Sequence, residues 1–176
     1  IRKKVSNYLD LPKDSQNETL PTLLQLVERR GDVERGKTLF NAAATCAKCH
    51  VVRGNGKAVG PELSEIGDKL SREAMFVSIL DPNAGISHNY ETYSVLLEDG
   101  VTLQGVKISD TPSAVTIKDT EAIVRVLPRD QIETIKKQTT SLMPADLQKV
   151  LTTEQLVDVV EYMTTLKKEA AATAPN

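Results

Sequence analysis

Two cysteines and a histidine stand together in the segment Cys46-Ala-Lys-Cys49-His50, and the chain has no other cysteine. If this turn is helical, positions 46, 49 and 50 project from one face, because residues three and four apart are neighbours on a helix. Two thiols so placed can add to the two vinyl groups of a haem, while the imidazole lies under the iron as its proximal ligand. C-x-x-C-H is the attachment signature of haem c. The motif therefore predicts one covalent haem c, held by Cys46 and Cys49 and ligated by His50.

Three other uses of these side chains fit the sequence less well. Zinc needs four ligands, whereas the only other histidine is His88, and the adjacent Cys49 and His50 are awkward partners for one ion. A thioredoxin-like redox pair follows a strand, yet the segment before Cys46 has a helical period. A structural disulfide between Cys46 and Cys49 is the main alternative, and it gives His50 no role.

The composition is that of an ordinary globular chain with one unusual shortage. The 176 residues carry a formal net charge of -2, which indicates no nucleic-acid surface. Because no apolar run reaches about 18 residues, the sequence predicts no membrane-spanning segment. Aromatic residues make up only 3% of the chain, with no Trp and two Phe. A buried porphyrin would supply the large apolar body that such a core lacks.

Helices are expected on both sides of the motif. Capping residues, prolines, glycines and apolar spacing predict them over residues 21–30, after Asp32, after Ser71, and over residues 151–167 behind the capping box of Thr152 and Gln155. Residues 51–67 contain several glycines and Pro61, so they are expected to form a loop.

Between the third and fourth helices the pattern changes to that of strands. Alternating apolar residues and the turn Asp99-Gly100 predict a small β unit over about residues 90–135. Its antiparallel strands are expected near residues 91–98, 101–109, 113–118 and 122–127. A structureless loop of this length would be unusual in a compact domain.

The two ends of the chain differ from its middle. Residues 1–30 are predicted to be a linker plus the first helix, residues 31–168 one domain, and residues 169–176 a disordered tail. Because the first residue is Ile1, we expect a C-terminal module of a longer protein, with a complete mature secreted protein as the alternative.

The order of these motifs resembles the class I c-type cytochromes. The opening is residues 31–40, the C-x-x-C-H motif and Gly60-Pro61-x-Leu63, and the close is Met143-Pro144 before the last helix. The interruption over about residues 86–139 is unusual for class I. It resembles the haem-binding domain at the C-terminal ends of large multidomain proteins of planctomycetes and verrucomicrobia. The resemblance spans about residues 31–168 and implies a mainly α fold, a class I cytochrome c-like helical haem domain interrupted by a small antiparallel β insertion.

The same resemblance implies roles for residues around the haem. Gly36 would lie where the first and last cytochrome helices cross, because only glycine lets two backbones approach so closely. Pro61 would offer its carbonyl to the outer ring N–H of His50, which fixes the tautomer. Each such residue also has an ordinary explanation as a turn, core or surface residue. The other haem-pocket candidates are Phe40, packed near Tyr162, Leu63, and, for the propionates, Arg53, Lys57, Tyr90 and Tyr93.

Met143 is the predicted sixth ligand of the iron. It lies in a loop directly before Pro144, which restricts Met143 to extended conformations and can hold a thioether rigidly. Met75 and Met163 fall on apolar helix faces, where methionine is more often core. His88 is the main rival, although a loop histidine beside Ser87 and Asn89 is more often exposed.

A haem with two protein ligands has no open position for substrate, so one-electron transfer is the predicted function. The chain would be an electron carrier rather than an enzyme, periplasmic or otherwise exported. Its partner would be a redox protein or a dehydrogenase, and the resemblance implies that the dehydrogenase can be fused upstream. Two alternatives are a haem enzyme or gas sensor with a labile sixth ligand, and an interaction module with a disulfide between Cys46 and Cys49. An absorption spectrum would distinguish all three.

Overall fold

A computed structural model describes residues 12–169 of the protein. Its main helices begin at residues whose side chains cap the first turn. Thr22 and Thr152 each form a capping box with the glutamine three residues later. Asp32 and Ser71 accept hydrogen bonds from the backbone N–H groups of Arg35 and Ala74. Within the described residues the α-helices are α2 (Leu23–Glu28), α3 (Val33–Asn41), α4 (Ile66–Lys69), α5 (Arg72–Leu80) and α6 (Thr153–Thr165). Short 3-10 turns are η1 (Cys46–Lys48), η2 (Arg129–Gln131) and η3 (Leu147–Val150).

α3 and α6 cross at very close range, and Gly36 makes this possible. A Cβ atom on Gly36 would overlap the carbonyl oxygen of Asp158 and lie 2.6 Å from its carbonyl carbon. One turn further along, the Phe40 ring packs edge-on against Tyr162, with 5.6 Å between ring centroids. The crossing therefore joins the helix that precedes the C-x-x-C-H motif directly to the last helix.

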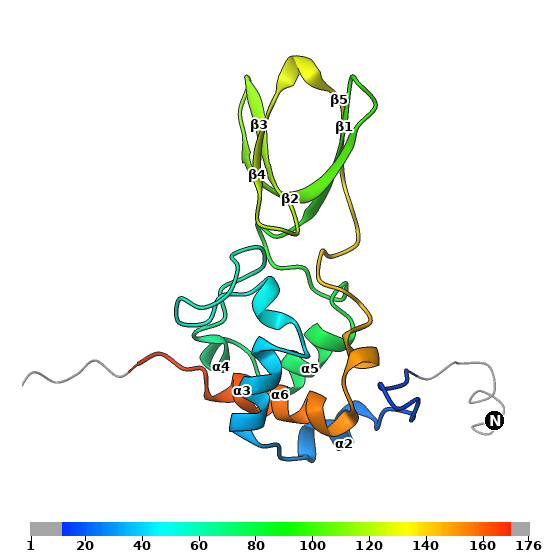
Figure 1. Ribbon diagram of the computed structural model, residues 1–176, viewed down its shortest axis with the longest axis vertical. Helices are drawn as coiled ribbons and strands as arrows, with labels where there is room; N and C mark the ends of the chain where they lie inside the picture. The colour runs from blue at the N-terminus through cyan, green and yellow to red at the C-terminus, as the bar shows by residue number, and fades with distance from the viewer. Residues whose placement is uncertain (1–11, 170–176) are drawn as a thin grey trace, which may run out of the picture.

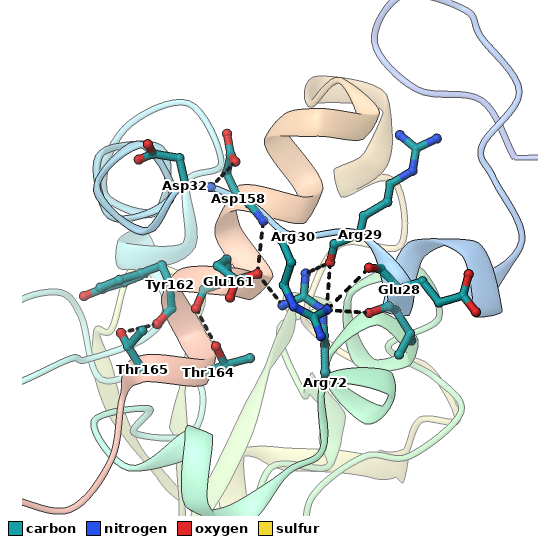
Figure 2. A network of polar contacts seen from close by, with 12 residues as sticks. Glu28, Arg29, Arg30, Asp32, Arg72, Asp158, Glu161, Tyr162, Thr164 and Thr165 are labelled. Carbon is teal, nitrogen blue, oxygen red and sulfur yellow. Dashed lines mark hydrogen bonds and ion pairs between the residues drawn. The ribbon is translucent and has the colours of Figure 1, made fainter.

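Two carboxylates of α6 complete this crossing with a polar network (Figure 2). Asp158, whose exposed fraction is 3%, accepts from the backbone N–H of Asp32 at 2.7 Å and from Nε of Arg35 at 2.9 Å. Glu161 accepts from Nη1 of Arg72 at 2.8 Å and from the backbone N–H of residue 31 at 3.0 Å. A buried carboxylate is costly unless it is hydrogen-bonded in this way. The network thus holds the start of α3 and the start of α5 against α6.

The helical part has one hydrophobic core, to which all its longer helices contribute. Leu26 of α2 is fully buried in this core, although it precedes the domain that was predicted to start at residue 31. The core therefore includes α2. Its other fully or nearly fully buried large side chains include Phe40, Met75, Phe76, Leu151, Leu156, Val159 and Val160.

The middle of the chain forms one five-stranded antiparallel sheet in the order β4-β3-β2-β1-β5. Its strands are β1 (Thr92–Leu97), β2 (Thr102–Asp110), β3 (Ala114–Lys118), β4 (Val124–Pro128) and β5 (Ile132–Lys137). Figure 1 shows it as a curved sheet that stands at one end of the molecule, beyond the helices. Its strands bury a second hydrophobic cluster of Val95, Val115, Ile117 and Leu127, separate from the helical core.

The prediction of a mainly α protein is wrong. Helices make up 32% and strands 22% of the structure, and the strands form a complete five-stranded sheet rather than a minor addition. The four predicted strands are present, but β5 was missed. A β-bulge where β5 pairs with β1 puts Ile132 and Ile135 in the same cluster at a spacing of three, which hides the alternation of a strand.

Two segments connect the sheet to the helices, and they are tied to each other. The outgoing segment follows α5, and the returning segment leads to η3. The backbone N–H of Ser141 in the second donates to Oδ1 of Asn83 in the first at 2.8 Å. The predicted linker before residue 12 and the predicted tail after residue 169 lie outside the described residues. Among those residues, no helix is long and apolar enough to cross a membrane.

The close crossing makes a prediction for Gly36. Replacing it with alanine should lower the free energy of unfolding by about 1–3 kcal/mol, because the new methyl group overlaps backbone atoms of α6. Helix propensity alone would act in the opposite direction. Chemical denaturation followed by circular dichroism measures the change. Gly85→Ala is the matched control, since no atom lies within 4 Å of the added Cβ. A Gly36→Ala protein as stable as the wild type would contradict this account of the crossing.

Candidate haem-binding site

The C-x-x-C-H motif forms the tight turn that its chemistry requires. α3 ends at Asn41, and η1 begins at Cys46 after a short connection in which Thr45 has a φ of 57°. The backbone N–H groups of Cys49 and His50 both donate to the carbonyl of Cys46, at 3.0 and 2.9 Å. One helical turn therefore gathers the two thiols and the imidazole.

An apolar cavity lies beside this turn, between it and the helices. It holds about 370 Å³ of empty space, including space open to solvent. Cys46, His50 and Met143 line it together, although Met143 is distant from the other two in the sequence. The remaining lining residues are Phe40, Ala44, Leu63, Ile79, Leu147, Leu151, Val159 and Met163.

The ring of His50 is held in one orientation by the loop that follows it. Its Nδ1 lies 2.7 Å from the carbonyl oxygen of Pro61. Because a carbonyl only accepts, Nδ1 carries the proton and Nε2 keeps its lone pair. A Cβ on Gly60 would lie 2.7 Å from Cε1 of the ring, so glycine is needed for the loop to pass this close. The neutral imidazole is thus oriented as a metal ligand needs.

Burial sets the protonation of the motif. It lowers the pKa of His50, which the hydrogen bond to Pro61 opposes, so the ring is more readily neutral than a free histidine. Burial raises the pKa of Cys46 to about 12. It also raises the pKa of Cys49, and the charge of Glu121 acts in the same direction. Both cysteines are free thiols rather than a disulfide.

Of the two candidate sixth ligands that lie outside helices, Met143 and His88, only Met143 lines the cavity. It is half-buried against the helical core, and its backbone N–H donates to Oγ of Ser141 at 3.1 Å. The side chain of His88 is 87% exposed and lies 3.9 Å from Glu91, outside the cavity lining. Met75 is buried in α5 and also does not line the cavity, whereas Met163 of α6 does.

The four residues that the sequence suggested for the propionates do not line the cavity. Tyr93 packs in the cluster of the sheet, where Nζ of Lys107 lies 4.3 Å from its ring centroid. Tyr90 precedes β1, and the side chains of Arg53 and Lys57 are 54% and 48% exposed. None of these four residues belongs to the cavity lining. They were chosen by residue type alone, and the structure offers no support for their assignment to the propionates.

Sequence reasoning missed several apolar residues of the lining. Ile79, Leu147, Leu151 and Val159 line the cavity from α5, η3 and α6 or from positions beside them. They belong to apolar helix faces that looked like ordinary core, so no local signal distinguished them. The signal that did exist was global, namely the shortage of aromatic bulk.

This donor set fits a haem c. Two free thiols and a neutral imidazole occupy one turn, and the imidazole shares an apolar cavity with a thioether. Thiols are needed for the covalent links, and nitrogen and sulfur donors suit haem iron.

One family comparison agrees with this site. Residues 33–96 match the family model described as Cytochrome c, which supports a c-type cytochrome domain with haem c and a general role in electron transfer. The match covers α3, the C-x-x-C-H motif, α4 and α5, and ends within β1, before Met143 and α6. No curated protein matches the chain.

The unequal pKa values of the two thiols predict unequal reactivity in the haem-free folded protein. At pH 8, Cys49 should be alkylated by iodoacetamide faster than Cys46, because the thiolate reacts and burial raises the pKa of Cys46 to about 12. Peptide mass spectrometry of timed samples measures both rates. Denatured protein is the control, since there the two thiols should react alike. Faster labelling of Cys46 in the folded protein would contradict this assignment.

Proposed function

We propose that this chain binds one haem c covalently through Cys46 and Cys49 and transfers single electrons, with His50 and Met143 as axial ligands. The observation that carries the proposal is the cavity shared by Cys46, His50 and Met143, whose other lining residues are apolar. The match of residues 33–96 to the cytochrome c family supports its general part.

Each of these residues has a distinct task. The thiols of Cys46 and Cys49 form the thioether links, so the cofactor is not lost. His50 presents the lone pair of Nε2, because its Nδ1–H donates a hydrogen bond to the Pro61 carbonyl. Met143 presents its thioether from the opposite end of the sequence, and Pro144 restricts its backbone. The bound haem supplies a one-electron redox couple at its iron.

Electron transfer fits these ligands better than catalysis on a substrate. Two protein ligands leave no open coordination position, and the apolar lining keeps water away from the centre. Thioether ligation favours ferrous iron and raises the reduction potential relative to two histidines. The chain therefore acts as a carrier between a donor and an acceptor.

The cellular setting belongs to the same proposal. The donor is a dehydrogenase, as a partner or as an upstream part of the same polypeptide, and the compartment is the periplasm or another exported location. Cytochrome c domains are commonly exported, which supports this setting. The five-stranded sheet between α5 and the Met143 segment supports a relation to the haem-binding domains of planctomycetes and verrucomicrobia.

Covalent attachment makes the first prediction of this proposal. The denatured wild-type protein should have the mass of the chain plus one haem, with no free thiol. Cys46→Ala and Cys49→Ala should each retain one thioether link, and the double variant should release its haem into acidic organic solvent. Intact-mass spectrometry measures this. Haem that is extracted from the wild type, or two titratable thiols in it, would rule the attachment out.

The sixth ligand makes the second prediction. Met143→Ala should abolish the weak long-wavelength sulfur-to-iron band of the ferric protein and lower the midpoint potential, because the thioether no longer stabilises ferrous iron. Absorption spectroscopy and redox titration measure the two effects. Met163→Ala and His88→Ala are the matched controls, since Met163 lines the same cavity and His88 is exposed. Loss of the band in Met163→Ala, with its retention in Met143→Ala, would reassign the ligand to Met163, and a wild type without the band would point to His88.

A further inference from the structure

The sheet touches the loop that follows the C-x-x-C-H motif. Nζ of Lys118, the last residue of β3, donates to the carbonyl oxygen of Ala58 at 2.6 Å. Nearby, Nζ of Lys57 lies 3.1 Å from Oε2 of Glu121, in the turn between β3 and β4. Both contacts join segments some sixty residues apart in the sequence.

The loop that receives these contacts holds the motif through its backbone. The N–H of Lys57 donates to the carbonyl of Ala47 at 3.0 Å. The N–H groups of Val59 and Gly60 both donate to the carbonyl of Cys49, at 3.0 and 2.7 Å. The next residue, Pro61, accepts the hydrogen bond from His50. Ala58 thus lies in the middle of the short segment that orients the imidazole.

The turn of the sheet is itself well ordered, so it can act as a fixed point. Oδ1 of Asp119 accepts from the backbone N–H groups of Glu121 and Ile123, both at 2.9 Å. Lys118 is paired on both sides, with Val106 of β2 and Val124 of β4. The residue before it, Ile117, is 1% exposed in the sheet's own cluster. A contact from such a pre-ordered segment costs little further entropy.

We propose that Lys118 and Glu121 are positioning residues that clamp the loop of residues 57–61 and so keep the Pro61 carbonyl against His50. The inference rests on the proposed function in one respect, that His50 binds the haem iron. The sheet then acts on the redox centre through the loop, without lining the cavity.

Lys118 carries more of this clamp than Glu121. Its ammonium bonds directly to the loop backbone through a charge-assisted hydrogen bond, although this bond is also exposed to solvent. The ion pair of Lys57 and Glu121 is between side chains that are 48% and 70% exposed, so water weakens it.

A direct effect of the two charges on the iron is the rival explanation, and it has a different signature. Removing the positive charge of Lys118 would lower the midpoint potential, whereas removing the negative charge of Glu121 would raise it. A clamp predicts that both changes act in the same direction, because either one frees the same loop. With the Pro61 hydrogen bond weakened, His50 becomes a less basic ligand and both potentials should rise.

The test compares Lys118→Met, Glu121→Gln and Lys118→Arg with the control Lys137→Met, all as haem-loaded proteins. Lys137 is also a lysine of the sheet, but it pairs with Glu91, away from the loop. Amide hydrogen exchange at Val59 and Gly60 reports the opening of the loop and does not depend on the haem signal. Redox titration gives the midpoint potentials, and denaturation gives the global stability.

Exchange at Val59 and Gly60 should become about fivefold to tenfold faster in Lys118→Met, as expected for the loss of one solvent-exposed hydrogen bond. In Glu121→Gln the exchange should also become faster, but to a smaller degree. It should be unchanged in Lys118→Arg and Lys137→Met, and the potentials of the first two variants should both rise. Unchanged exchange in Lys118→Met, or potentials that move in opposite directions, would overturn the clamp. A wild type with no haem c spectrum would instead reject the proposed function, which this experiment therefore distinguishes.

Discussion

The crossing of α3 and α6 at Gly36 is the constraint on which the haem-binding site depends. The two backbones approach so closely that no side chain fits between them, and the buried carboxylate of Asp158 bonds to the start of α3 across the contact. α3 leads through a short connection into the turn of Cys46, while α6 supplies Val159 and Met163 to the cavity. Any rotation of one helix against the other would move the motif relative to that wall. The polar network at one end and the Phe40–Tyr162 contact further along prevent such rotation from both sides.

Two separate hydrophobic cores explain how this arrangement accommodates a long interruption. The cluster of the sheet contains Val95, Val115, Ile117 and Leu127, and it shares no residue with the helical core. The sheet can therefore satisfy its own apolar side chains without replacing any helical contact. The helical core, in contrast, does not fill its own interior. It borders the cavity beside His50, and the sequence has few aromatic residues that could fill this space. A haem in this cavity would complete the helical core, which is consistent with the shortage of Trp and Phe in the sequence.

The sequence predicted best where local chemistry determines structure. The caps of Asp32, Ser71 and Thr152 are local hydrogen bonds, and the helices begin where these residues indicate. The turn of Cys46 to His50 likewise follows from local spacing. Prediction failed where partners distant in sequence decide the outcome. β5 exists because it pairs with β1, and its bulge disguises the strand pattern, so the mainly α prediction was wrong. The contacts of Lys118 and Glu121 with the loop after the motif had no sequence signal for the same reason, since only the folded sheet brings them there.

The inserted sheet is placed to influence both sides of the cavity through different kinds of contact. On the side of His50, the turn between β3 and β4 bonds to a loop that already makes several backbone hydrogen bonds with the motif. On the side of Met143, the chain returns from β5 through a segment with two hydrogen bonds. The backbone N–H of Ser141 donates to Asn83, and Oγ of Ser141 accepts from the backbone N–H of Met143. The histidine is thus held by a dense set of bonds, and the methionine by a few. Local stability follows the number of such bonds, so the Met143 segment needs less free energy to open than the loop beside His50.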